Sequence, residues 1–345
     1  MKTRSIIYLA LLFLVTAFLP LRAEAQIEGT GGTAGAAYLL VPSTARIASL
    51  GGTLTGGLPD INGLEALTIN PAGLVSNPGT SALFSRMNYL ADIGVNTFGI
   101  GQRLGNNQLA LVVTAWDFGD IPLTTEASPE ITSLEWSASV ITVGGSYARQ
   151  FTDRIAAGIT AKLLNETIDD MSATGIAFDA GMNYTVGETG LRFGVSLNNF
   201  GLTMKYAGDG LVREVRIPGQ SETSTTNSVA IQSAGYELPS LLNFGASYTI
   251  NAGADASATF LANFQSNSLD ADLYSGGLEL SLRNILYVRG GYQWQENMDL
   301  TAFKGWNVGA GLRIDAVGTQ LMVDYAYRPT ELLGNVQMIT ASVAL

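Results

Sequence analysis

Apolar residues alternate with small or polar residues along most of this chain, and this period of two is the feature that most limits its possible folds. Strict alternation indicates β-strand, because successive side chains of a strand point to opposite faces. The alternating segments are roughly twice as long as the ~5–6-residue strands of typical soluble proteins. Clear examples are 176–186, 191–198, 242–251, 306–315 and 338–345.

The length of these segments and the connections between them favour a membrane barrel over a soluble sandwich. No apolar run beyond the first 25 residues is long enough for a helical span, so a membrane-spanning chain of this kind must close its strands into a barrel. Connections after the even-numbered segments are short and most others are longer, as expected for periplasmic turns and extracellular loops. We therefore predict an all-β fold, a transmembrane antiparallel β-barrel of about fourteen strands. The expected strands are 82–89, 92–103, 107–117, 136–150, 154–168, 174–186, 189–200, 240–251, 256–267, 272–283, 285–295, 303–315, 319–329 and 337–345.

The N-terminal part of the sequence indicates that the chain is exported and that a segment of it lies inside the barrel. Residues 1–25 combine Lys2 and Arg4, an apolar stretch and Ala-Glu-Ala at 23–25, which is typical of a cleaved signal peptide. Residues 26–80 do not alternate, and we expect them to fold into the barrel as a plug, or hatch; a periplasmic extension is the alternative. The barrel itself is expected to occupy 81–345. The predicted location is the bacterial outer membrane, with its lipids as direct neighbours.

Composition excludes most enzymes. The chain contains no histidine and no cysteine, so it cannot build a histidine-based catalytic site, a thiolate nucleophile or a His/Cys metal site. We expect no catalytic residue, no cofactor and no metal. The net charge of −11 makes nucleic acid an unsuitable partner. A lipid-modifying enzyme stays as a remote alternative, which an activity assay would dismiss.

Charged residues at lumen-facing positions are the candidate site within the barrel. We expect them to pair across the lumen and hold the hatch, or alternatively to line a solute path. Because their signs are mixed, a strongly ion-selective pore is disfavoured. Arg46 in the hatch is expected to pair with a wall carboxylate such as Asp179 or Asp324. The principal lumen-facing candidates are Asp179, Arg192, Glu279, Arg283, Arg313 and Asp324.

The N-terminal segment also carries motifs in a characteristic order. Pro42 is followed by Ala45-Arg46, then by a Gly-Gly turn, and then by Asn-Pro-Ala-Gly-Leu directly before the first strand. In this arrangement the sequence resembles the PorV/PorQ family of outer-membrane proteins over nearly all of its mature length. It departs from the family in offering one acid, Asp60, after the Gly-Gly turn, and it ends in Leu345 where many outer-membrane barrels end in Phe. The hatch residues that match are Arg46, Gly51, Gly52, Asn70, Pro71 and Gly73.

The resemblance implies a FadL-like fold, meaning a fourteen-stranded barrel with an N-terminal hatch, and two possible functions. The first, which we favour from sequence, is a non-enzymatic component of a type IX-like protein secretion pathway. It would bind or shuttle exported cargo with C-terminal sorting domains and contact a translocon subunit, with the long 201–239 connection as a candidate surface. The alternative is a FadL-like transporter of hydrophobic small molecules, which requires an apolar pocket between hatch and lumen.

Overall fold

The computed structural model describes residues 35–59, 61, 63–124, 135–215, 227–253, 255–296, 298, 302–316, 318–331 and 333–345. The predicted signal peptide, 1–25, lies outside the described residues. The chain divides into two units, Met1–Gly32 and Thr33–Leu345, and all the described residues belong to the second. In the described ranges, no helix is long and apolar enough to cross a membrane.

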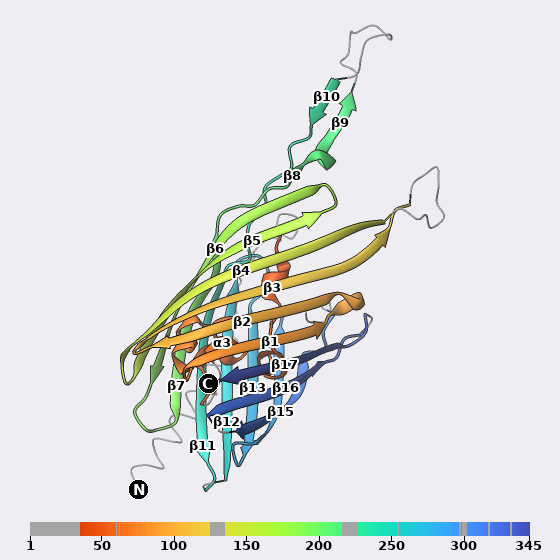
Figure 1. Cartoon of the computed structure of the whole chain (residues 1–345). Coiled ribbons are helices and arrows are strands. Elements are labelled where there is room, and N and C mark those ends of the chain that lie inside the picture. Colours follow the sequence, from red (N-terminus) through yellow and green to blue (C-terminus); the bar gives the residue numbers. More distant parts are fainter. Residues whose placement is uncertain are drawn as a thin grey trace. The chain divides into compact units, whose positions relative to one another are not determined.

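Fourteen antiparallel strands form a closed barrel, which confirms the predicted fold class (Figure 1). Each strand pairs with its neighbours in sequence order, and β1 closes the ring by pairing with β17, with Ser81 opposite Ala344. Closure leaves no unpaired sheet edge, as a membrane environment requires. The barrel strands are β1 (Thr80–Asn88), β2 (Gly94–Leu104), β3 (Asn107–Pro122), β4 (Glu135–Thr152), β5 (Ile155–Ile168), β6 (Met171–Thr185), β7 (Leu191–Gly201), β11 (Leu241–Asn251), β12 (Ala256–Asn267), β13 (Leu273–Leu282), β14 (Leu286–Gln295), β15 (Trp306–Ala316), β16 (Thr319–Arg328) and β17 (Val336–Ala344).

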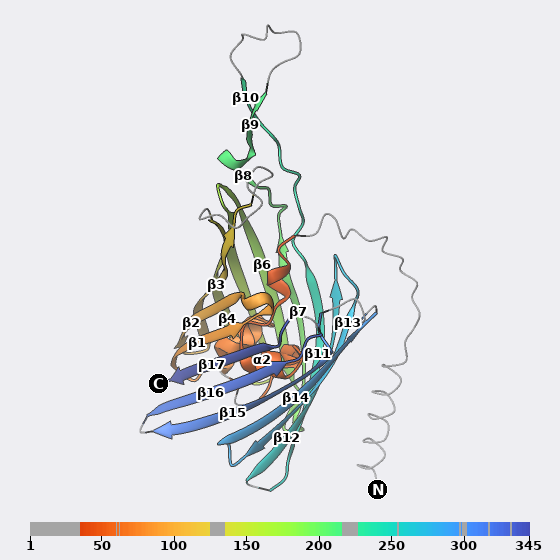
Figure 2. The same ribbon diagram turned by 90° about the vertical axis from the view of Figure 1, so that its right-hand side faces the viewer.

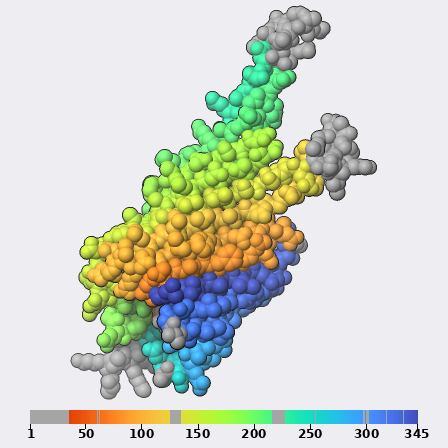
Figure 3. Space-filling view, viewed as in Figure 1, coloured from red at the N-terminus to blue at the C-terminus, as the bar shows by residue number. Residues whose placement is uncertain are grey.

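The two faces of the strands differ as the alternation predicts. Outward-pointing Phe84 and Phe98 are 51% and 50% exposed, whereas inward-pointing Ser85 and Thr97 are buried. A closed barrel with large apolar side chains outside and small polar ones inside is suited to a lipid environment. The outer surface of β1–β6 is continuous in the space-filling view (Figure 3).

Apart from the end of β3, the strand ends lie within three residues of the predicted bounds, and two of the differences have a cause in the backbone. β3 continues to Pro122 through a register shift between Asp117 and Asp120, so the strand extends well past the alternating segment. β13 ends at Leu282, because Arg283 and Asn284 adopt positive φ angles of 54° and 53° and turn the chain into β14.

The N-terminal segment, residues 35–79, is called the hatch from here on. Its short helices lie within the ring of strands (Figure 2), and Ile47, Leu50 and Leu74 have no exposed surface. Helices this short are not stable alone, so packing against the barrel wall must stabilise them. They are η1 (Ala37–Leu40), α2 (Ala45–Ser49), η2 (Leu54–Gly56), α3 (Gly63–Leu67) and η3 (Pro71–Ser76).

The long connection between β7 and β11 contains β8 (Ala207–Gly208), η5 (Asp209–Leu211), β9 (Val212–Val215) and β10 (Asn227–Ala230). β9 and β10 pair with each other in a separate two-stranded sheet. This hairpin projects beyond one end of the barrel (Figure 1). The shorter connection between β1 and β2 contains η4 (Leu90–Asp92).

Candidate functional site

The hatch motif residues shape the path of the hatch chain. Gly51 and Gly52 follow α2 with φ angles of +66° and +72°, a conformation that glycine adopts without strain. The Asn70 side chain caps η3, where it accepts a hydrogen bond from the Ala72 backbone N at 3.0 Å. Gly73 packs so closely that a Cβ there would lie 2.4 Å from the Cβ of Ala66. These residues therefore act as turn and packing residues of the hatch.

Glycines in the wall allow the hatch to approach the strands closely. A Cβ at Gly158 in β5 would lie 2.5 Å from the backbone O of Pro71, and a Cβ at Gly181 in β6 would lie 2.0 Å from Asn70 Oδ1. Asn70 Nδ2 also donates to the backbone O of Thr55 at 2.9 Å. The Asn-Pro turn thus packs directly against the backbone of β5 and β6.

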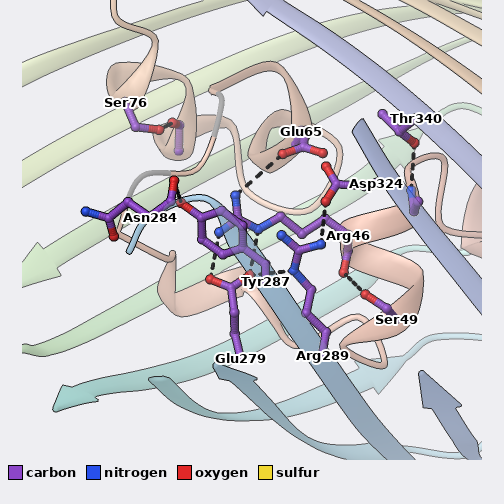
Figure 4. Close-up of polar contacts among 12 residues, drawn as sticks. Arg46, Ser49, Glu65, Ser76, Glu279, Asn284, Tyr287, Arg289, Asp324 and Thr340 are labelled. Atoms are coloured by element: carbon purple, nitrogen blue, oxygen red, sulfur yellow. Dashed lines mark hydrogen bonds and ion pairs between the residues drawn. The ribbon is translucent and has the colours of Figure 1, made fainter. Parts of the chain in front are cut away.

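A buried charge cluster joins the hatch to the opposite part of the wall (Figure 4). Arg46 Nε donates to Glu279 Oε2 at 2.9 Å, and Arg46 Nη2 donates to Glu279 Oε1 at 2.7 Å. Arg289 Nε donates to the same Glu279 Oε2 at 2.6 Å, and Arg289 Nη1 pairs with Asp324. The geometry of Arg46 on Glu279 is bidentate, the arrangement in which a guanidinium–carboxylate pair is strongest.

With Glu65 of α3, this cluster has more carboxyl groups than guanidinium groups. Its Oε2 lies 3.9 Å from Arg46 Nη1, and neither carboxyl oxygen has a hydrogen-bond partner among the described residues. The cluster then contains three carboxyl groups, of Glu65, Glu279 and Asp324, and two guanidinium groups. Burial, assisted by nearby Asp324, raises the pKa of Glu65 to about 8. A neutral Glu65 brings the cluster to zero net charge.

Four of the six lumen-facing candidates, Asp179 among them, lie outside this cluster. Arg192 is half-buried at the start of β7. Arg313 is half-buried on β15 and donates from Nε to Asp315 Oδ1 at 3.0 Å. The prediction that Arg283 faces the lumen is wrong, because β13 ends one residue earlier and Arg283 is exposed in the turn.

The expected partners of Arg46 also need correction. Arg46 binds Glu279, whereas Asp324 belongs to the same cluster through Arg289. Asp179 lies in a different part of the lumen, where its Oδ2 is 2.6 Å from Lys162 Nζ.

A cavity of about 90 Å³ lies between the hatch and the inner face of β1–β6. On the hatch side it is lined by residues of η1, the segment that follows it, and the end of α3. The wall side is apolar near β1–β3 and hydroxyl-rich near β4 and β5. Of the candidate residues predicted from the sequence, Asp179 lines this cavity. The lining residues include Leu39, Val41, Ser43, Met87, Trp116, Thr142, Gly144, Lys162 and Asp179.

A second cavity, of about 80 Å³, lies against the other side of α3. Leu67 and Thr68 line the first cavity, whereas Ala66 and Gly73 line the second. The second cavity also reaches Arg154 and Arg192, near the short turns of the barrel. The short helix α3 therefore separates the two cavities.

Comparison with known proteins places the fold. No family model matches the sequence, and no curated protein matches it either. Among solved structures, the chain is similar to the Pseudomonas putida toluene transporter TodX, with 12% identity, 86% of this chain and 96% of that chain covered, and a TM-score of 0.56. It is also similar to a Pseudomonas aeruginosa FadL homologue (11% identity, 88% and 98% covered, TM-score 0.55) and to the Ralstonia pickettii toluene transporter TbuX (11%, 88% and 98%, TM-score 0.50). The fold is a FadL-like barrel with an internal hatch.

Proposed function

We propose that this protein conducts small, mainly apolar molecules across a bacterial outer membrane. The observation that carries the proposal is the cavity between hatch and wall, in which Leu39, Val41 and Trp116 provide an apolar lining. Ligand sites are typically concave and apolar with a few polar groups that fix orientation. The solved structures of the same fold are described as toluene transporters and as a FadL homologue, which supports this function over secretion.

The volume of the cavity suits a small ligand. An engineered apolar cavity of about 150 Å³ binds benzene, so about 90 Å³ requires a modest rearrangement to admit one ring. Met87 lines the cavity, and an unbranched methionine side chain adapts easily to such a change. We therefore expect one-ring molecules or short aliphatic chains as ligands.

Two neighbouring glycines of β4 provide a matched test. Gly144 is buried and lines the cavity, and the nearest atom to a Cβ added there would be Thr160 Cγ2 at 3.5 Å, an ordinary contact. Gly145 is exposed on the outer face, with nothing within 4 Å of an added Cβ. G144F should fill the cavity and abolish toluene uptake into proteoliposomes, whereas G145F should transport toluene like the native protein. Equal uptake by both variants would count against the cavity as the route.

A second candidate function is the type IX-like secretion role. It is supported by the sequence resemblance and by apolar side chains on the projecting hairpin, where Val212, Val215, Val229 and Ile231 are exposed. Exposed apolar residues on a projecting element are suited to a protein partner. In this role the hairpin would contact a translocon subunit or cargo with a C-terminal sorting domain.

Crosslinked pull-down from native outer membranes tests the secretion role. A large translocon subunit, or several proteins with a shared C-terminal domain, should be captured by the native protein. A variant with 209–231 replaced by a short Gly-Ser turn should lose them. If the native barrel captures neither, the secretion role is excluded.

A further inference from the structure

The first cavity contains two charged side chains among its lining residues, and they neutralise each other. Lys162 Nζ lies 2.6 Å from Asp179 Oδ2 and donates to Asn199 Oδ1 at 2.8 Å. The Asp179 side chain is 1% exposed and that of Lys162 is 15% exposed. The ammonium group therefore borders the cavity with its charge already compensated.

The backbone holds Asp179 in this position. The pairing of β6 with β7 shifts register between Phe178 and Ala180, so Asp179 lies at an irregularity of the strand. Opposite it, Asn199 adopts a positive φ of 59°, and its backbone N donates to Asp179 Oδ1 at 2.8 Å. Register irregularities of this kind often redirect a side chain for a specific purpose. Here the carboxylate is directed at Lys162.

Two hydroxyl groups of the lining have no hydrogen-bond partner in the part of the chain that the structure describes. Thr142 Oγ1 and Ser43 Oγ are buried and make no hydrogen bond to any described residue. A buried polar group without a partner is unfavourable, so a ligand that brings a hydroxyl or carbonyl group would satisfy it. One hydroxyl belongs to the wall and the other to the hatch. The rest of the lining near them, including Val41 and Trp116, is apolar.

We propose that the cavity selects neutral, mainly apolar molecules that carry a single hydroxyl or carbonyl group, and that Asp179 is a specificity-determining residue. Thr142 and Ser43 hydrogen-bond the polar group of the ligand. Asp179 neutralises Lys162, which would otherwise attract carboxylates. This inference rests on the proposed transport of small apolar molecules and names their chemical class.

Three para-substituted fluorobenzenes test the selection, and the methyl and hydroxyl probes among them are matched in size. The probes are p-fluorotoluene, p-fluorophenol and p-fluorobenzoate, observed by fluorine NMR with the full-length protein in detergent. At pH 7 the phenol is neutral and the benzoate is charged. Specific binding is the difference between the binding measured with the native protein and with G144F. Partitioning of the probe into the micelle is common to both and cancels. The native protein should bind the phenol most tightly, the toluene more weakly and the benzoate not at all.

Two substitutions assign the roles. T142V keeps the shape of the side chain and should lower the phenol-to-toluene affinity ratio by about three- to tenfold, as expected for one hydrogen bond. D179N keeps an acceptor for the Asn199 N–H and exposes the charge of Lys162. It should raise the benzoate-to-toluene ratio by about tenfold or more, a gain that K162M in the same chain should remove. D315N, which removes an exposed acid away from the cavity, should change neither ratio.

The possible results separate this inference from the function beneath it. If the native protein binds none of the probes specifically, the proposed transport function fails. If it binds the benzoate as tightly as the phenol, transport stands and the selection for neutral ligands is overturned, and this comparison needs no variant. If D179N folds and binds no more benzoate than the native protein, Asp179 does not determine specificity.

Discussion

Replacement of Arg46 by methionine should release the hatch from the barrel wall. Methionine keeps an unbranched side chain but removes the guanidinium that contacts Glu279 through two hydrogen bonds. Arg289 is then the one guanidinium left in the cluster to compensate the charge of its carboxylates. Removal of one partner from a buried ion pair typically costs about 3–5 kcal/mol. Because Arg46 belongs to the hatch and its partner to β13, this loss falls on hatch docking, and the undocked population should rise roughly a hundredfold to several thousandfold.

The absence of cysteine from the chain makes this prediction easy to measure. Ser49 in α2 is fully buried, so S49C is a single thiol that reacts with maleimide only when the hatch undocks. S228C on the exposed β10 provides the reference rate. R46M should raise the S49C rate relative to S228C, and R46M with E279Q should recover part of the protection, because no lone charge is left. Labelling of R46M as slow as that of the Arg46 parent would refute the anchoring role of the cluster.

Three further perturbations test other parts of the structure. The pKa of Glu65 is about 8 in the docked hatch, above its ordinary value of 4.5. The docked state therefore binds the proton more tightly, so docking should be strongest below about pH 4.5 and weaken as the pH rises through about 8. E65Q should flatten this profile, measured as the S49C labelling ratio at each pH, and a flat native profile would contradict the assignment. G73A should destabilise hatch docking by about 1–3 kcal/mol, because the added methyl group overpacks the hatch. Labelling of S49C should therefore become faster, and an unchanged rate would show that the hatch accommodates the methyl group freely. F98K, in the middle of β2, should destabilise the barrel folded in a bilayer by about 2–4 kcal/mol, measured by urea titration. Q102K, near the end of the same strand, should have little effect. Equal effects of the two substitutions would argue against a lipid-facing β2.

The barrel could be predicted from sequence because its main signal is local. Each spanning strand must place apolar side chains on lipid and small polar ones inside, and this requirement produces an alternation that one segment shows by itself. The predicted strand 256–267 coincides with β12. β3 was underestimated because its last residues lie beyond a register shift, where the alternation no longer applies.

Some contacts between residues of the lumen wall can also be predicted from the sequence. The hairpin of β13 and β14 turns at 283–285, and counting back from this turn places Glu279 opposite Arg289, as the structure has it. Alternation alone predicts that a residue faces inward but not its height in the barrel. The partner of Arg46 depends on the path of a hatch that has no repeating pattern, which is why Glu279 could not be named in advance. The transporter alternative required an apolar pocket between hatch and lumen, but most of its lining could not be named for the same reason, since the cavity forms only where hatch and wall meet.

The helices α2 and α3 of the hatch differ in how firmly they are attached to the barrel wall. This difference suggests which helix moves when a ligand passes. Arg46 of α2 is fixed by a buried bidentate pair, whereas α3 separates two cavities and contributes Glu65, which makes no hydrogen bond among the described residues. Displacement of α3 alone would join the cavities without breaking the pair between Arg46 and Glu279. We therefore expect toluene to speed maleimide labelling of A66C, a position that is 1% exposed, and to leave S49C protected. Equal acceleration at both positions would mean that the whole hatch leaves the wall, and the charge cluster would then open in every transport cycle.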